Sequence, residues 1–455
     1  MLLLFVTCLL RAVFGFRVSS TWKQRHACMH EWKHVRLRPA AMKKEVPMMT
    51  VADDRNLQDA PSPSSPKAAE DSLVQWILSE GGFVGKVNIE TRDGLRGLFV
   101  SDDVSAGDVL LEVPKACVIS AEDNPDFGLS LRELATARLV GALTRGENAA
   151  YTQSLPKQVP LLVDWTAGEL DLLQSPHMVE VAAGIQPFLD ESHARVLPFV
   201  KADLPTVAWA ERMVRSRAFL FETHDWSYQP HLCLLPLIDI ANHRTLPRGA
   251  IQPIRVLRDE KVVQLRAPTD LKAGEQVYLS YGHGENEKLL QDYGFAELLT
   301  PEQPCVEPLH LESTVPGFPL VLGSDEADER ALATLRLQLS NGTSKLAADE
   351  EATLNRAVCQ ALLRSCHSEL ARMPTSEQED RERLAKTTTA PLEALDPDCW
   401  PQEGLDPDRW RSALIFRIGQ KAQLTRTAEA LSGLLAGGAA PTAQEVCAAL
   451  RALRA

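Results

Sequence analysis

Short runs of hydrophobic residues, separated by turn residues, predict a group of β-strands near residue 100. The runs lie at Val87–Ile89, Gly97–Val100 and Val109–Val113. Asp-Gly and Ala-Gly pairs stand between them, and runs of this length bounded by turns are typical of a small meander of strands. Before the first run, apolar residues at helical spacing follow an Asp-Ser pair, which is a favourable helix cap. A helix is therefore predicted over Asp71–Leu78.

A helical region follows these strands, and a second set of strands follows the helices. Apolar residues at helical spacing predict helices over Leu129–Leu143, Met178–Ala194 and Thr206–Phe221. Strand patterns return at Cys233–Asp239, Ile254–Leu257, Val262–Leu265 and Gln276–Tyr281. A short helix is predicted over Asn286–Tyr293, and the rest of the chain is mostly helical, notably at Ala347–Leu370 and Trp410–Leu434. No period of about 20–50 residues repeats, so solenoid and propeller folds are excluded.

The start of the chain has the composition of a targeting leader. Met1–Phe16 is almost entirely apolar, but it is shorter than the roughly 20 residues that a membrane span needs. Arg17–Lys44 is basic and nearly free of acids. A signal-like segment, residues 1–15, before a transit-like segment, residues 16–45, is typical of a bipartite plastid leader. We therefore expect a plastid protein with a flexible linker at Ala60–Lys67; a mitochondrial presequence, a cytoplasmic location and a membrane anchor are the alternatives.

Charge divides the chain in the same way. Residues 1–44 hold nine Lys or Arg and one acid, a net charge of +8, whereas the remaining 411 residues hold 39 basic and 60 acidic side chains, a net charge of −21. A body this acidic repels phosphates, so nucleic acid is not an expected partner.

The cysteines and histidines form no recognisable metal or disulfide pattern. The nine cysteines include no C-x-x-C pair, so reduced and buried thiols are expected. His30 and His34 have a spacing compatible with a metal ion, but they lie in the leader and have no partner pair. The sequence therefore predicts no metal site.

Four motifs place polar or aromatic groups on otherwise hydrophobic segments. The first lies at Gly94–Val100 and Ala106–Pro114, the second at Ser216–Phe219, the third at Leu235–His243, and the fourth at Ala273–Gly282 and Asn286–Phe295. Glycines beside an arginine allow the backbone to approach a ligand closely, and a buried Asn242-His243 pair needs hydrogen-bond partners. Tyr281 ends a predicted strand and Tyr293 ends a predicted helix, and glycine follows each. Taken singly, each motif also fits a turn, a helix cap or ordinary packing.

In this order and spacing the motifs resemble those of the SET-domain protein methyltransferases. They are most similar to the subgroup of Rubisco large-subunit lysine methyltransferase, which also includes the actin-histidine methyltransferase. The resemblance covers roughly Leu73–Phe295 and extends to Phe416–Lys421 in the tail. It implies an α+β protein in which a β-rich, pseudoknotted SET fold with a helical insert precedes an all-α substrate-binding domain. The implied division is a leader and linker at residues 1–66, a SET domain at 67–300 with its insert at about 120–215, and a substrate-binding domain at 301–455.

The resemblance also implies S-adenosylmethionine (SAM) as the cofactor and assigns roles to the motif residues. Tyr281 is the expected catalytic residue, and the expected substrate-binding residues are Tyr293, Asp239 and Arg217. The expected cofactor-binding residues are Gly94, Leu95, Arg96, Arg217, Asn242, His243, Gly294 and Phe295. Methyl transfer is a direct displacement, so the alignment of the two reactants supplies much of the rate and few acid or base groups are needed.

The implied function is SAM-dependent methylation of a lysine in a folded, non-histone protein, such as the plastid proteins Rubisco or aldolase. No membrane is expected in the mature form. Arg244 stands where the family usually has Ser or Thr, and Phe221 stands where Rubisco-methylating relatives carry a basic residue. The cofactor side therefore matches the family more closely than the substrate side. Two alternatives remain, a protein-histidine methyltransferase and a SET domain that binds proteins without catalysis.

Overall fold

The computed structural model describes residues 66–453, except 93, 123–127, 222–229, 248, 258, 283–284, 299–306, 312–319, 341–346, 390–404 and 439. The expected leader and all of the linker before Pro66 lie outside the described residues. None of the helices in these ranges combines the length and the apolar composition that crossing a bilayer requires.

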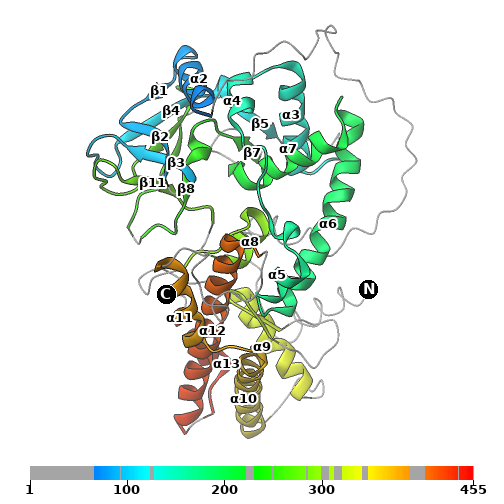
Figure 1. The fold of residues 1–455 in the computed structure, drawn as a ribbon. Coiled ribbons are helices and arrows are strands. Elements are labelled where there is room, and N and C mark those ends of the chain that lie inside the picture. The colour runs from blue at the N-terminus through cyan, green and yellow to red at the C-terminus, as the bar shows by residue number, and fades with distance from the viewer. Residues whose placement is uncertain are drawn as a thin grey trace.

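Three small sheets form one half of the molecule, in the upper part of Figure 1. In the first sheet, every pair of neighbouring strands is antiparallel. Its strands in spatial order are β1 (Phe83–Val84), β4 (Val109–Pro114), β10 (Val262–Arg266) and β9 (Ile254–Leu257).

The second sheet brings three of the sequence motifs together. Its strands in spatial order are β2 (Val87–Arg92), β3 (Leu95–Val100), β11 (Gln276–Leu279) and β8 (Asn242–His243). The short strand β8 runs parallel to β11 and pairs Asn242 with Tyr278. The Asn-His pair therefore lies beside the strand that leads to Tyr281.

The third sheet supports a set of helices. Its strands in spatial order are β5 (Ile119–Glu122), β7 (His231–Leu234) and β6 (Phe219–Phe221). The helices are α2 (Pro66–Ser79), α3 (Leu131–Arg145), α4 (Ala149–Ser154), α5 (Ala167–Asp171), α6 (Pro176–Val196) and α7 (Leu204–Arg217). Helix α3 begins after a capping box formed by Ser130 and Glu133. The Ser130 hydroxyl oxygen accepts from the backbone N–H of Glu133, and the Glu133 carboxylate accepts from the backbone N–H of Ser130.

Short 3₁₀ helices occur at turns between these elements. They span Lys115–Cys117, Leu162–Asp164, Leu197–Phe199 and Ile238–Ile240.

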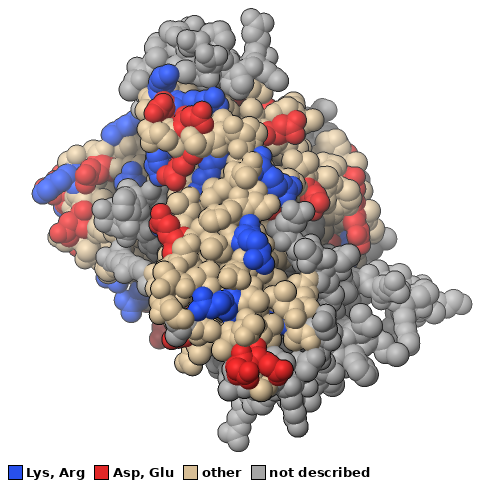
Figure 2. Space-filling view, turned by 90° about the horizontal axis from the view of Figure 1, so that it is seen from below, with Lys and Arg blue, Asp and Glu red and all other residues tan. Residues whose placement is uncertain are grey.

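The other half of the molecule is mostly helical. Helix α8 (Asn286–Tyr293) leads into it from the strands, as Figure 1 shows. Its further elements are β12 (Leu309–Leu311), β13 (Leu320–Leu322), α9 (Asp325–Leu339), α10 (Ala348–Arg372), α11 (Glu377–Thr389), α12 (Pro407–Ala436) and α13 (Ala443–Ala452). Seen from the end of these helices, the surface has a mainly uncharged centre, and acidic and basic side chains intermingle around it (Figure 2).

Buried apolar side chains form three clusters. The first fills the half that contains the sheets, and the second lies among β12, β13 and the C-terminal helices. The third cluster combines side chains from the insert, from α8 and from α12, including Met178, Leu290 and Trp410. The C-terminal region is therefore packed directly on the insert, because burial of these side chains depends on both.

The α+β class and the mostly helical C-terminal region are confirmed, and several predicted boundaries are wrong. Helix α2 begins at Pro66 and not at the Asp71-Ser72 pair, and Phe219–Phe221 forms a strand instead of the end of a helix. The strand predicted over Cys233–Asp239 ends at Leu234, because Pro236 has no N–H to donate and Leu237 has a φ of 67°.

Two features of the tail differ from the expectation. The strands β12 and β13 add a small antiparallel pair to a region expected to be all α. The charge run Glu377–Lys386 lies on a helix, as its composition suggests, but Asp380 within it is fully buried and paired with Arg417 and Lys421.

Candidate functional site

Four aromatic side chains from three separate segments form a continuous group at the edge of the second sheet. The ring centroids of Tyr281 and Tyr293 lie 4.7 Å apart, and those of Tyr293 and Phe295 lie 6.2 Å apart. His243 completes the group, with centroid distances of 5.1 Å to Tyr281 and 5.8 Å to Phe295. The structure thus brings the end of β11, the end of α8 and strand β8 to one place.

The Tyr281 hydroxyl is fixed by a hydrogen bond to the backbone. It donates to the carbonyl oxygen of Ala241 over 2.7 Å. Burial raises the pKa of Tyr281 well above its ordinary value, so the phenol stays neutral at physiological pH. With its proton engaged, the oxygen keeps lone pairs that can accept a hydrogen bond from a ligand.

His243 holds the backbone of Tyr281 in position. Its Nδ1 accepts the backbone N–H of Tyr281 over 3.0 Å, and its Nε2 lies 3.0 Å from a carboxylate oxygen of Glu297. This arrangement requires a neutral ring with its proton on Nε2. The described contacts of the His243 side chain are therefore with Tyr281 and Glu297, and its binding of a ligand stays a prediction.

Glu297 anchors the loop that follows β8. Its carboxylate accepts from the backbone N–H of Thr245 at 3.0 Å and from the Thr245 hydroxyl at 2.7 Å. Burial raises the pKa of Glu297, but the hydrogen bonds from His243 and Thr245 outweigh this and lower the pKa below its ordinary value. Glu297 therefore stays charged and secures His243.

A buried cluster of polar groups lies next to Tyr281. The Asp239 carboxylate accepts from the hydroxyl of Tyr151 over 2.8 Å, and it lies 3.5 Å from Arg217 Nη1. The same Nη1 donates to the carbonyl oxygen of Asp239 over 2.9 Å. Burial raises the pKa of Asp239, and the charge of Arg217 opposes this rise. Asp239 thus orients Arg217 and Tyr151 instead of facing an open channel alone.

The turn before Asp239 is strained. Leu237 has a φ of 67° and a ψ of −47°, which residues with a Cβ rarely adopt. Its side chain is nonetheless buried. Packing of this leucine therefore holds the turn that presents Asp239.

Strand β3 contributes Arg96 and Gly97 to the same region. The side-chain amide of Asn242 donates to the carbonyl oxygen of Arg96 over 2.9 Å, and Arg96 Nη1 donates to the carbonyl oxygen of Ser154 over 2.9 Å. Burial lowers the pKa of Arg96, and the nearby Arg217 lowers it further. A Cβ on Gly97 would lie 2.9 Å from the Asn242 amide nitrogen, so this close approach requires glycine.

Gly94 lies at the exposed turn before β3, and Leu95 is the first residue of that strand, with a side chain that is 57% exposed. At the opposite end of the site, Gly294 ends α8 with a φ of 76°. A Cβ there would lie 2.3 Å from the carbonyl oxygen of Pro160. Glycine is therefore required at this position, and it directs Phe295 toward the aromatic group.

Two buried nitrogen atoms at the site lack a hydrogen-bond partner among the described residues. They are Nε of Arg217 and Nε2 of Gln276; Nε2 of His243 also makes no hydrogen bond of good geometry, but it lies 3.0 Å from the Glu297 carboxylate. A buried polar group without a partner is costly, and a guanidinium nitrogen is satisfied best by a carboxylate or phosphate oxygen. The site is therefore suited to a ligand with an anionic group next to Arg217.

The structure brings most of the expected residues together and adds two that the sequence did not indicate. Tyr151 and Glu297 hold Asp239 and His243 in place, but Tyr151 is 88 residues from its partner in the chain. Arg244 stacks on a neighbouring ring, with its guanidinium carbon 3.9 Å from the centroid of Tyr278.

Two protein-family models match consecutive parts of this chain. Residues 95–282 match the family model for the SET domain, and residues 286–424 match the model described as Rubisco LSMT substrate-binding. The chain is 24% identical over 378 residues to the chloroplastic ribulose-1,5-bisphosphate carboxylase/oxygenase large subunit N-methyltransferase of Pisum sativum, covering 69% of this chain and 75% of that protein.

A second relative and a solved structure also match this chain. The chain is 25% identical over 262 residues to the chloroplastic fructose-bisphosphate aldolase-lysine N-methyltransferase of Arabidopsis thaliana, covering 49% of this chain and 51% of that protein. A crystal structure of the SET domain of LSMT bound to lysine and AdoHcy superposes with a TM-score of 0.56 at 21% identity, covering 81% of this chain and 92% of that one. This likeness shows that the two chains share a fold.

Proposed function

The chain belongs to the SET-domain protein methyltransferases that carry a Rubisco LSMT-type substrate-binding domain, and we propose that it transfers a methyl group from SAM to a lysine of a folded, non-histone protein. The observation that carries this proposal is the placement of Arg217, whose Nε has no hydrogen-bond partner among the described residues, beside the rings of Tyr281 and Tyr293. One side of the site suits an anionic group and the other suits an aliphatic amine.

The residues on the Arg217 side fit the polar parts of SAM. Arg217 would pair with its carboxylate through Nε, and Asp239 holds the guanidinium in place for this contact. The backbone near Arg96 and at Asn242-His243 would hold the rest of the molecule, with Gly294 and Phe295 beside its base. When bound, SAM supplies a methyl group activated by a sulfonium sulfur.

The residues on the tyrosine side fit a lysine side chain. At pH 7.5 only about 0.1% of a lysine amine with its usual pKa of about 10.4 is neutral. Transfer of the ammonium into the space between aromatic rings lowers its pKa, because the charged form is desolvated. The Tyr281 oxygen would then accept an N–H of the amine and direct its lone pair toward the methyl group.

Asp239 would not act as a general base in this scheme. Its carboxylate is already engaged by Tyr151 and Arg217, and the amine loses its proton to solvent before transfer. We therefore treat Asp239, Tyr151 and Glu297 as positioning residues, and Tyr281 as the catalytic residue.

The domain division proposed here is a SET domain at residues 67–300 and a substrate-binding domain at 301–455. The two family matches, at 95–282 and 286–424, support it. Burial of Met178, Leu290 and Trp410 in one cluster supports a fixed arrangement of the two parts. The C-terminal region would then present a folded protein to the site instead of an extended peptide.

We propose a plastid location for the protein, with Rubisco or aldolase as examples of its substrate class. The composition of residues 1–45 supports a plastid leader, and the relatives from pea and Arabidopsis are both chloroplastic enzymes. Import of the full chain, fused to a fluorescent protein, would distinguish the plastid from the mitochondrion and the cytoplasm.

Calorimetric titration of the full chain with SAM tests the proposed function. We expect one site in the wild type and a roughly 10- to 150-fold weaker site in Arg217→Met, because a charge-assisted hydrogen bond contributes about 1.5–3 kcal/mol. Arg255→Met, at an exposed position of β9, is the control and should bind normally. Absence of SAM binding by the wild type would contradict the proposal and favour a non-catalytic scaffold.

A further inference from the structure

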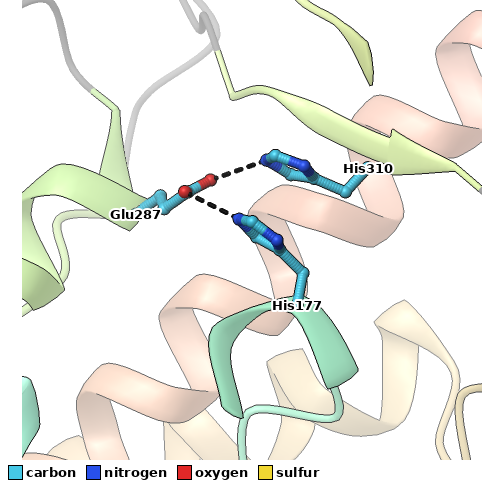
Figure 3. A group of neighbouring side chains, drawn as sticks. All are labelled: His177, Glu287 and His310. Carbon is cyan, nitrogen blue, oxygen red and sulfur yellow. Dashed lines mark hydrogen bonds and ion pairs between the residues drawn. The ribbon is translucent and has the colours of Figure 1, made fainter. Parts of the chain in front are cut away.

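A second cluster of titratable side chains lies away from the aromatic group and joins three parts of the chain. His177 is in the first turn of α6, Glu287 is in α8 and His310 is in β12 (Figure 3). The insert, the end of the strand-rich half and the start of the C-terminal region therefore meet at these three side chains. The methyl-transfer scheme above uses none of them.

The three side chains direct their polar atoms toward one another. Nε2 of His177 lies 3.0 Å from one carboxylate oxygen of Glu287, and Nε2 of His310 lies 3.1 Å from the other. One ligand atom from each residue can be chosen so that all three lie within 4.8 Å of one another. The two His–Glu separations are close to those around a tetrahedral zinc ion, where bonds of about 2.0–2.1 Å place neighbouring ligand atoms roughly 3.4 Å apart.

The two histidine rings are stacked. Their ring centroids lie 3.4 Å apart with an angle of 14° between the planes, as the stacked rings in Figure 3 show. Neutral imidazole is the form that binds a metal ion, and each ring can keep its proton on Nδ1 while Nε2 binds.

The surroundings favour a cation. The carboxylates of Glu285 and Glu287 both act electrostatically on the buried Glu307, so negative charge gathers at this end of α8. Burial, reinforced by these two neighbours, raises the pKa of the nearly inaccessible Glu307 to about 8. The side chains of His177 and His310 are 30% and 26% exposed, which leaves a path for an ion and room for a water ligand.

We propose that His177, Glu287 and His310 bind one divalent first-row transition metal ion, of which Zn²⁺ is the first to test, and that this ion clamps the C-terminal region onto the insert and α8. Two imidazoles and one carboxylate form a donor set that zinc accepts with a water in the fourth position. Mg²⁺ and Ca²⁺ prefer oxygen ligands, so the site discriminates against them. The sequence predicted no metal, because the ligands are separated by 110 and 23 residues and form no motif.

Titration of the full chain with Zn²⁺, after removal of metal by a chelator, tests this proposal. Calorimetry should detect one equivalent in the wild type that is lost in the His177→Asn/His310→Asn variant. Two controls should keep this equivalent, His30→Asn/His34→Asn in the leader and His367→Asn at an exposed position of α10. Zn²⁺ should also raise the melting temperature of the wild type and of both controls, but not that of the double variant.

A second variant distinguishes a loss of Zn²⁺ binding from a folding defect. Glu287→Gln keeps the size of the side chain and a hydrogen-bonding oxygen, and it should weaken Zn²⁺ binding at least about tenfold. Co²⁺ used as a spectroscopic probe should give visible absorption bands in the wild type and not in either variant. Equal Zn²⁺ binding by the wild type and both variants, or no binding by the wild type, would overturn the proposal and leave the cluster as a hydrogen-bonded contact between the two regions.

Discussion

Removal of the Tyr281 hydroxyl should lower the rate of methyl transfer without weakening the binding of SAM. In Tyr281→Phe the ring remains, together with its contacts to Tyr293 and His243. The backbone N–H that donates to His243 also remains. The variant therefore loses one oxygen atom and little of the surrounding structure.

The size of the effect follows from the two interactions that this oxygen makes. The 2.7 Å hydrogen bond to the carbonyl of Ala241 is lost, which leaves a buried acceptor without this partner and costs about 1–3 kcal/mol of stability. The contact with the reacting amine is also lost. The amine nitrogen becomes positively charged as it takes the methyl group, and a hydrogen bond to a charged group contributes about 1.5–3 kcal/mol, which corresponds to a roughly 10- to 150-fold lower kcat.

The assay is transfer of radiolabelled methyl groups from SAM to the protein substrate, measured beside calorimetric SAM binding. Tyr281→Phe should bind SAM as the wild type does and lose most of its turnover. Tyr278→Phe is the matched control, because Tyr278 lies on the same strand but its ring stacks with Arg244. Wild-type turnover in Tyr281→Phe, or an equal loss in Tyr278→Phe, would refute the assignment of Tyr281.

Two further predictions concern stability. Gly294→Ala places a Cβ 2.3 Å from the carbonyl oxygen of Pro160 at a φ of 76°, so its melting temperature should fall by several degrees, whereas Gly433→Ala, which meets open space within α12, should be neutral or stabilising. In the folded protein, burial raises the pKa of Asp164, but hydrogen bonds from Arg212 and from a backbone N–H lower it overall. The stabilisation from Asp164 is therefore present above its unfolded pKa of about 3.9 and is lost as the pH falls through its lower folded pKa. Asp164→Asn should melt below the wild type at pH 7, and the difference should shrink in melting curves recorded at successively lower pH. A constant difference would contradict the pKa argument.

The strands and the helix around the site could be predicted because their patterns are local. Asn286–Tyr293 forms a helix at the predicted residues, and β9 matches its predicted range, Ile254–Leu257. Each element has apolar residues at its own period between turn residues. The error at Cys233–Asp239 arose because its apolar residues continue past the strand, and Leu237 takes a positive φ that only the surrounding packing can stabilise.

The contacts that hold the site could not be predicted, because they join distant parts of the chain. Tyr151 comes from the insert and reaches Asp239, and nothing in the local sequence of α4 indicates a buried hydroxyl donor. The contacts of the His243 side chain could not be predicted either. Its motif indicates a polar group that needs partners, but the choice between a ligand and the pair of Tyr281 and Glu297 depends on the fold.

The most direct test of the proposed function is identification of the methylated residue. The full chain, incubated with labelled SAM and a plastid extract, should label a protein in which mass spectrometry finds methyl-lysine. The label should disappear when Tyr281→Phe replaces the wild type. Methyl-histidine in the labelled protein would contradict lysine specificity, and absence of any label with the wild type would contradict the assignment as a methyltransferase.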